Sequence, residues 1–153
     1  MTCIAVSIKH SALAADTRCS ADGVMFEVSK AKRVGKGVVG VAGDWDDILR
    51  FWEVIDGKPH KESGLSDDSE LEGIELHPDG IFLYAASGKR YAIKDQFFAI
   101  GSGAPYAIGA MAMGATPQEA VALAARFDPA TGGPIEVIPL KATNASSINR
   151  KRR

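Results

Sequence analysis

The chain has 153 residues, of which 46% are hydrophobic and 24% are charged, and its formal net charge is -1. These values suit one soluble domain with a buried core. They exclude a disordered chain, a membrane protein and a protein with a broad nucleic-acid-binding surface. No apolar run is as long as a membrane span and no signal peptide is visible, so we expect a cytoplasmic protein without membrane contact.

The cysteines and histidines are few and scattered. Cys3 and Cys19 cannot form a disulfide framework and lack CxxC spacing, while His10, His60 and His77 lack the spacing of a metal site. We therefore expect two reduced thiols and neither a metal nor an organic cofactor.

Charge is distributed unevenly along the chain. Residues 44–79 contain twelve acidic residues against three Lys or Arg, and residues 149–153 read Asn-Arg-Lys-Arg-Arg. We expect a solvated acidic face and a basic, disordered tail over residues 141–153. The tail could contact nucleic acid or an acidic partner, but four terminal basic residues are weak evidence, so nucleic-acid binding is not expected.

The first third of the chain is rich in strand patterns. Apolar residues alternate over residues 2–8 and a second apolar run covers residues 11–16, which predicts a β-hairpin. Further strands are expected over residues 24–28, 30–34 and 38–42.

A helix is expected directly after Gly43. Asp44 can cap its N-terminus, and Gly57 ends an apolar stripe made by Ile48, Leu49, Phe51, Trp52 and Ile55. Residues 58–68 are polar and are expected to form a loop. Three antiparallel strands should follow over residues 71–76, 81–85 and 90–93.

Two helices and a strand complete the pattern. A strand over residues 96–100 leads into an Ala/Met-rich helix over residues 105–113. Thr116, Pro117 and Glu119 form a helix-start signature, followed by an expected buried face of Val121, Leu123 and Phe127. A last strand is expected over residues 134–140. This order predicts an α+β fold of antiparallel sheets flanked by helices, in one domain over residues 1–140.

Thr2 offers the chemistry of a nucleophile. Removal of Met1 would place a free α-amine beside the Thr2 hydroxyl. A terminal amine with a reference pKa of about 7.7 to 8.0 can accept the hydroxyl proton near neutral pH, so one residue can supply both nucleophile and base. Met-Thr alone is a common chain start and carries little weight.

Several separated segments resemble one known family. They are Ala14-Ala15-Asp16, the basic run 29–33, Gly40-Val41-Ala42-Gly43, the segment 98–106 and Asp128-Pro129-Ala130-Thr131-Gly132-Gly133. Their order resembles proteasome β-subunits and the bacterial HslV-type peptidase, which are N-terminal-nucleophile hydrolases. The resemblance implies a short bacterial or phage-like member with a sandwich of antiparallel sheets.

Residue roles follow from this resemblance. It implies Thr2 as nucleophile, Asp16 and Lys30 as a charged pair beneath it, and Gly43 as a backbone donor to the oxyanion. Lys32 is the register alternative to Lys30. The alternative without catalysis is a surface lysine, a turn aspartate and a helix-start glycine.

Further positions match the family's supporting residues. Ser102 matches a serine that orders the terminal amine, while Asp128 and Thr131 match residues that brace the same corner. Each could instead be a turn or capping residue. Val41 would line the first substrate pocket. Thr131 replaces a serine and Asp44 puts a carboxylate after the oxyanion glycine, which are departures from the family pattern.

The resemblance implies a threonine-type endopeptidase acting on polypeptides. Two alternatives stay open: a hydrolase of a small amide and a noncatalytic assembly protein. The resemblance also implies a homo-oligomer and allows a separate ATPase unfoldase, since the chain has no GxxxxGK[ST] phosphate-binding motif. Residues 58–68 leave no room for the family's second long helix, which predicts a reduced first helical layer.

Overall fold

Two antiparallel sheets form the centre of the computed structural model, which describes residues 2–141. The strands of the first sheet are β1 (Ile4–Ser7), β2 (Ala12–Ala15), β10 (Phe97–Ile100) and β11 (Glu136–Pro139). Those of the second sheet are β5 (Ala31–Val34), β6 (Gly37–Ala42), β7 (Glu72–His77), β8 (Gly80–Tyr84) and β9 (Arg90–Ile93). The strand orders are β10-β1-β2-β11 and β5-β6-β7-β8-β9.

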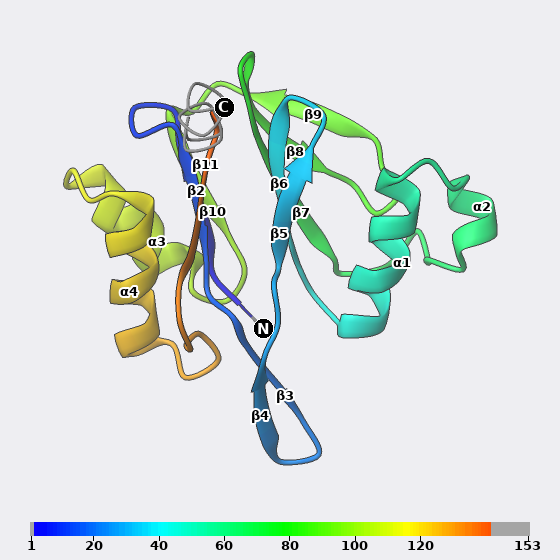
Figure 1. Cartoon of the computed structure of the whole chain (residues 1–153), viewed down its shortest axis with the longest axis horizontal. Helices are drawn as coiled ribbons and strands as arrows, with labels where there is room; N and C mark the ends of the chain where they lie inside the picture. The colour runs from blue at the N-terminus through cyan, green and yellow to red at the C-terminus, as the bar shows by residue number, and fades with distance from the viewer. Residues whose placement is uncertain (1, 142–153) are drawn as a thin grey trace, which may run out of the picture.

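Helices cover the outer faces of both sheets (Figure 1). The helices are α1 (Trp45–Ile55), α2 (His60–Ser63), α3 (Ala104–Ala112) and α4 (Pro117–Phe127). The pair α3 and α4 lies on the first sheet, and α1 with α2 lies on the second. The predicted α+β sandwich is therefore confirmed.

Successive side chains of a strand point to opposite faces of the sheet, so the first sheet contributes to two hydrophobic cores. Ile4 and Val6 of β1 point toward the second sheet and are fully buried with Leu13 and Ile74. Ala5 points the other way, into the cluster beneath α3 and α4. The sheets approach closely at Gly40, where a Cβ atom would lie 2.7 Å from Ile4 Cγ2. Small residues on one face thus allow helix packing, and large ones fill the space between sheets.

The two predicted helix caps, at Asp44 and Thr116, are confirmed. The Asp44 carboxylate accepts a hydrogen bond of 3.0 Å from the Asp46 backbone N–H at the start of α1. Thr116 and Glu119 form a reciprocal capping box at the start of α4. These caps satisfy amide groups that have no partner inside the helix.

Four details differ from the sequence expectations. The polar segment 58–68, expected as a loop, contains the short helix α2. Gly64 at φ +74° ends this helix after one turn. Leu49 is 47% exposed and Phe127 is 57% exposed, so neither lies on a buried face. A helical period shows which residues share a face but not how far the neighbouring sheet extends.

A projecting hairpin is the fourth difference. It pairs β3 (Arg18–Ala21) with β4 (Val24–Glu27), and it extends beyond the sandwich (Figure 1). The sequence predicted β4, but Arg18–Ala21 carries no apolar alternation and was not expected as a strand. Its turn uses Asp22 and Gly23 at positive φ, a conformation typical of two-residue hairpin turns.

The described part of the chain ends at residue 141. The predicted basic tail lies beyond it, over residues 142–153, and Met1 is also outside the described residues. Among residues 2–141, no helix has both the length and the apolar character needed to cross a membrane.

Candidate active site

A cleft of about 1040 Å³ lies beside the start of the described chain. Thr2 forms part of its wall, together with the hairpin β3–β4 on one side and the start of α1 on the other. The segments 68–72, 101–102 and 129–130 complete the lining. Of the predicted site residues, Thr2, Lys30, Gly43 and Ser102 line the cleft, whereas Asp16, Asp128, Thr131 and Val41 do not.

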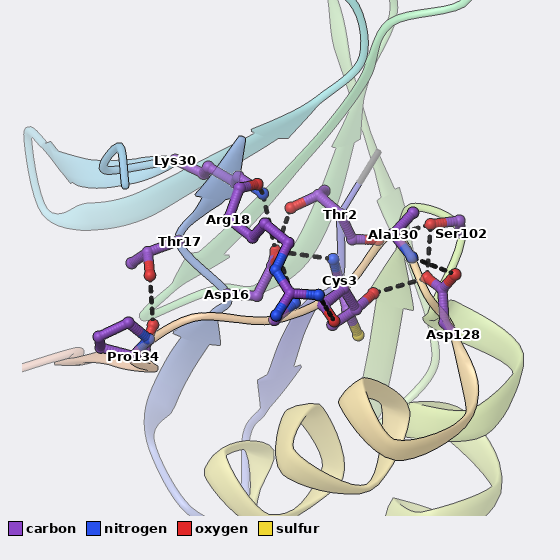
Figure 2. Close-up of polar contacts among 12 residues, drawn as sticks. Thr2, Cys3, Asp16, Thr17, Arg18, Lys30, Ser102, Asp128, Ala130 and Pro134 are labelled. Atoms are coloured by element: carbon purple, nitrogen blue, oxygen red, sulfur yellow. Dashed lines mark hydrogen bonds and ion pairs between the residues drawn. The ribbon is translucent and has the colours of Figure 1, made fainter. Parts of the chain in front are cut away.

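Thr2 and Lys30, which line the cleft, meet at Asp16 (Figure 2). The Thr2 hydroxyl donates a hydrogen bond to Asp16 Oδ1, and Lys30 Nζ lies 3.0 Å from the same oxygen. Thr2 is 2% exposed, Asp16 is 0% and Lys30 is 4%. Because all three residues are buried, water screens the ion pair between Asp16 and Lys30 only weakly.

Backbone groups hold this charged pair in place. The amides of Cys3 and Gly132 each donate a 3.0 Å hydrogen bond to Asp16, one to each carboxylate oxygen. Lys30 Nζ also donates to the Arg18 carbonyl at 2.5 Å. Gly132 was identified in the sequence only within a motif, without a role, and Arg18 was not identified, because any residue type can supply a backbone carbonyl acceptor.

Lys32 makes different contacts from Lys30. Its ammonium group lies 3.1 Å from the Asp56 carboxylate and 4.6 Å from the centroid of the Trp52 ring, both on α1 or at its end. Lys30 precedes β5 and its carbonyl accepts from the Val41 amide, whereas Lys32 lies within the strand. Lys30 is thus the lysine that faces Thr2.

A second polar group lies on the other side of Thr2. Ser102 and Thr131 each donate a 2.6 Å hydrogen bond to Asp128 Oδ2, and the Ala130 amide donates a 3.1 Å bond to Oδ1. The Ser102 hydroxyl also lies 3.4 Å from the Thr2 carbonyl oxygen. The three predicted supporting residues therefore form one network that touches the Thr2 backbone.

This network lowers the pKa of the Asp128 carboxyl group. Burial by itself raises its pKa, but the hydrogen bonds from Ser102, Thr131 and the Ala130 amide stabilise the carboxylate, and the net effect lowers the pKa. Asp128 is therefore an anion at neutral pH. A negative charge at this position can attract a protonated amine at the amino terminus of the chain.

Gly43 and Val41 occupy different environments. Gly43 is exposed on the cleft wall at φ +146°, a conformation that favours glycine, and a Cβ there would lie 3.2 Å from Leu71 Cα. Val41 is fully buried in the cluster with Ile48 and Phe51. Val41 therefore does not line the cleft, because α1 packs against its side of the strand.

Gly101 brings the next loop against Thr2. A Cβ atom on Gly101 would lie 2.1 Å from the Thr2 carbonyl oxygen, and its φ of +90° also favours glycine. The Gly101 amide donates a 2.9 Å hydrogen bond to the Glu72 carboxylate at the start of β7. Since Glu72 is paired with Ala42, which precedes Gly43, this bond connects the two sides of the cleft.

Cys3 is the thiol next to Thr2. Burial, followed by the negative charges of Asp16 and Asp128, raises its pKa to about 12, so it stays a neutral thiol. Among residues 2–141, no group of three or more histidine, cysteine or acidic side chains is arranged to hold a metal ion. The reactive group best supported by the geometry is the Thr2 hydroxyl.

Comparison with known proteins identifies the fold. No protein-family model and no curated protein matches the sequence. BPH from Thiobacillus denitrificans is similar in structure, both in complex with epoxomicin (TM-score 0.68, 23% identity, 92% of this chain and 100% of that chain) and alone (0.65, 24%, 93% and 99%). HslV from Trypanosoma brucei is also similar, with a TM-score of 0.62, 18% identity, and coverage of 90% and 99%. The chain therefore has the fold of BPH and of HslV, which is the type of sandwich that its sequence motifs predicted.

Proposed function

We propose that this protein is a threonine-type endopeptidase whose nucleophile is Thr2, exposed as the amino terminus after removal of Met1. The observation that carries the proposal is the buried contact of the Thr2 hydroxyl with Asp16, which is itself paired with Lys30. The fold is consistent with this chemistry, and one of the similar structures is a complex with epoxomicin.

The first step is attack by Thr2 Oγ1 on a peptide carbonyl carbon. The free α-amine of Thr2 takes the hydroxyl proton, while the Lys30 cation stabilises the negative charge that develops on Oγ1. Asp16 keeps Lys30 in position, and backbone donors keep Asp16 in position. Asp128 and Ser102 would bind the terminal ammonium group, which is supported by the Ser102 contacts with Asp128 and with the Thr2 carbonyl oxygen.

The later steps use the cleft wall. Gly43 offers its backbone N–H to the oxyanion of the tetrahedral intermediate, which then collapses as the C–N bond breaks. The ammonium group returns its proton to the leaving amine, and an ester between Thr2 and the acyl part of the substrate remains. The same amine then activates a water molecule, which hydrolyses the ester and restores Thr2.

We also propose that the protein acts as a homo-oligomer that encloses its active sites. Enclosure would prevent a permanently active nucleophile from reacting with folded proteins. Closed symmetry is the common arrangement of soluble oligomers. A separate ATPase would then supply unfolded chains. The short helix α2 in place of a second long helix changes the surface available to such partners.

Intact-mass measurement of the purified protein tests the nucleophile. We expect a chain that begins at Thr2 and gains the mass of one inhibitor molecule on treatment with epoxomicin, whose epoxyketone offers two electrophilic carbons to a hydroxyl and an amine. Peptide mapping should locate the adduct at Thr2. The Thr2→Ala variant is the matched control and should form no adduct and cut no peptide.

Two results would contradict the proposal. A chain that still begins at Met1 and forms no adduct would support a noncatalytic assembly protein. A Thr2 adduct without cleavage of any peptide, together with hydrolysis of small amides, would support the other alternative.

A further inference from the structure

The acidic part of the sequence is brought to the cleft by the fold. Carboxylates from the start of α1 and from the segment 68–72 line one side of the cavity that contains Thr2. They are Asp44, Asp46, Asp47, Asp68, Glu70 and Glu72. The basic residues of the same lining are Arg18 and Lys30, and Lys30 is neutralised by Asp16. The cleft wall is therefore strongly negative.

Three of these carboxylates make contacts that stabilise the fold. Asp44 caps α1, Asp47 accepts a 2.6 Å hydrogen bond from Ser69 and lies 3.7 Å from Arg50, and Glu72 binds the Gly101 amide. The remaining three, Asp46, Asp68 and Glu70, are exposed and have no cationic partner among residues 2–141. Mutual repulsion between these unpaired anions is relieved when a cation enters the cleft.

Apolar side chains adjoin these carboxylates. Trp45, Ile48 and Leu71 line the same part of the cleft and belong to the core cluster that continues behind it. Trp45 is partly exposed and lines the cleft, so a ligand in the cleft can contact it. A tryptophan face attracts a cation, and an apolar wall suits the methylene groups of lysine or arginine. The surface thus combines the two features that a long basic side chain needs.

We propose that this part of the cleft is a substrate subsite that selects peptides carrying lysine or arginine near the bond to be cut. The inference rests on the proposed peptidase function and adds its substrate class. The aliphatic stem lies against Trp45 and Leu71, and the charged end lies among Asp46, Asp68 and Glu70. Acidic peptides are disfavoured because they meet like charges in the same place.

A peptide series tests the subsite directly. Quenched fluorescent peptides of otherwise neutral sequence carry a single lysine at successive positions, and each has a partner with norleucine at the same position. We expect at least one position at which lysine raises kcat/KM about tenfold over norleucine. Glutamate at that position should lower it. Raising the salt concentration should reduce the lysine preference, because exposed charges are screened.

Variants identify the carboxylates responsible. Removing one exposed carboxylate, as in Asp46→Asn, Asp68→Asn or Glu70→Gln, should reduce the lysine-to-norleucine ratio about 1.4- to 5-fold, the range that exposed ion pairs contribute. The triple variant should remove the preference. Asp95→Asn removes an exposed carboxylate outside the cleft lining and should leave the ratio unchanged.

The outcomes separate this inference from the peptidase proposal. Cleavage without a lysine preference at any position, or a preference that survives in the triple variant, overturns the subsite while leaving the peptidase intact. Absence of cleavage together with absence of a Thr2 adduct overturns the peptidase and the subsite with it. The melting temperature of each variant shows that its fold is retained, and an unfolded triple variant is replaced by the single ones.

Discussion

Lys30 and Lys32 illustrate how two identical side chains receive different roles. Lys30 is 4% exposed and shares Asp16 with Thr2, whereas Lys32 reaches Asp56 at the surface. Exposed ion pairs contribute about 0 to 1 kcal/mol, while removing one member of a buried pair costs about 3–5 kcal/mol. The two lysines should therefore differ both in stability and in activity.

Lys30→Ala is expected to reduce peptide cleavage about 100-fold or more, because the developing charge on Thr2 Oγ1 loses its stabilising cation. Lys32→Ala should keep most of the activity. Steady-state kinetics would be measured on protein whose fold is verified by circular dichroism. A folded, active Lys30→Ala protein would refute the assigned role, and loss of activity in Lys32→Ala alone would assign it to the other lysine.

Asp128 should make the stability of the fold depend on pH. Its folded-state pKa is lowered, so the carboxylate adds stability at pH values above the unfolded value of about 3.9, and this contribution disappears as pH falls toward the folded-state pKa. Asp128→Asn should be less stable at pH 7 by about 1–3 kcal/mol. Its free energy of unfolding should also fall less steeply below pH 4.

Urea unfolding between pH 3 and pH 7 would measure this difference. Asp95→Asn serves as the control, since Asp95 is exposed and lies outside the Ser102 and Thr131 network. An Asp128→Asn protein with the acid sensitivity of the parent would show that other carboxylates cause it.

At the scale of elements, two loop-to-helix junctions permit a matched comparison. Gly101 precedes α3 and lies against the Thr2 carbonyl, so Gly101→Ala forces either a shift of Thr2 or backbone strain of about 1–3 kcal/mol. Thr116→Ala removes the cap of α4 and costs about 1 kcal/mol. Both variants should melt at lower temperature, but only Gly101→Ala should slow the reaction of Thr2 with epoxomicin.

The rate of adduct formation by mass spectrometry distinguishes the two variants. Thr116 lies at the far end of the helical pair, outside the cleft lining, so its cap affects stability without moving the nucleophile. Equal adduct rates in Gly101→Ala and the parent would show that the loop tolerates the added methyl group without displacing Thr2.

Helices and strands were predicted well where the signal lies within a few residues, as in a helix cap or the alternation of apolar and polar residues along a strand. The caps at Asp44 and Thr116 and the strands of both sheets follow from such signals. The burial of Phe127 was predicted wrongly, and Leu49 in the apolar stripe of α1 is also exposed, because burial depends on how far the neighbouring sheet extends. The site residues came from a resemblance to a family, since residues 14 and 28 positions from Thr2 share no local pattern with it.

The whole molecule presents an apolar surface on its α3 and α4 layer. Tyr106 and Phe127 are 43% and 57% exposed and stack on each other at a centroid distance of 5.7 Å. Met113, at the end of α3, is 89% exposed. Neighbouring exposed apolar side chains often mark a contact surface. This layer is therefore our proposed interface between copies of the chain, and the α1 layer lies on the opposite side of the sandwich (Figure 1).

Met113→Asp is expected to split the oligomer, because it places a charge in an apolar contact that offers no partner for it. Light scattering at micromolar concentration should show a particle well above 16.2 kDa for the parent and a shift toward that mass for the variant. Leu49→Asp makes the same change on an exposed position of α1 and should leave the assembly intact. A parent that is monomeric and active would refute enclosure. If Leu49→Asp dissociates the oligomer and Met113→Asp does not, the interface lies on the α1 layer, whose second helix is reduced to the single turn of α2.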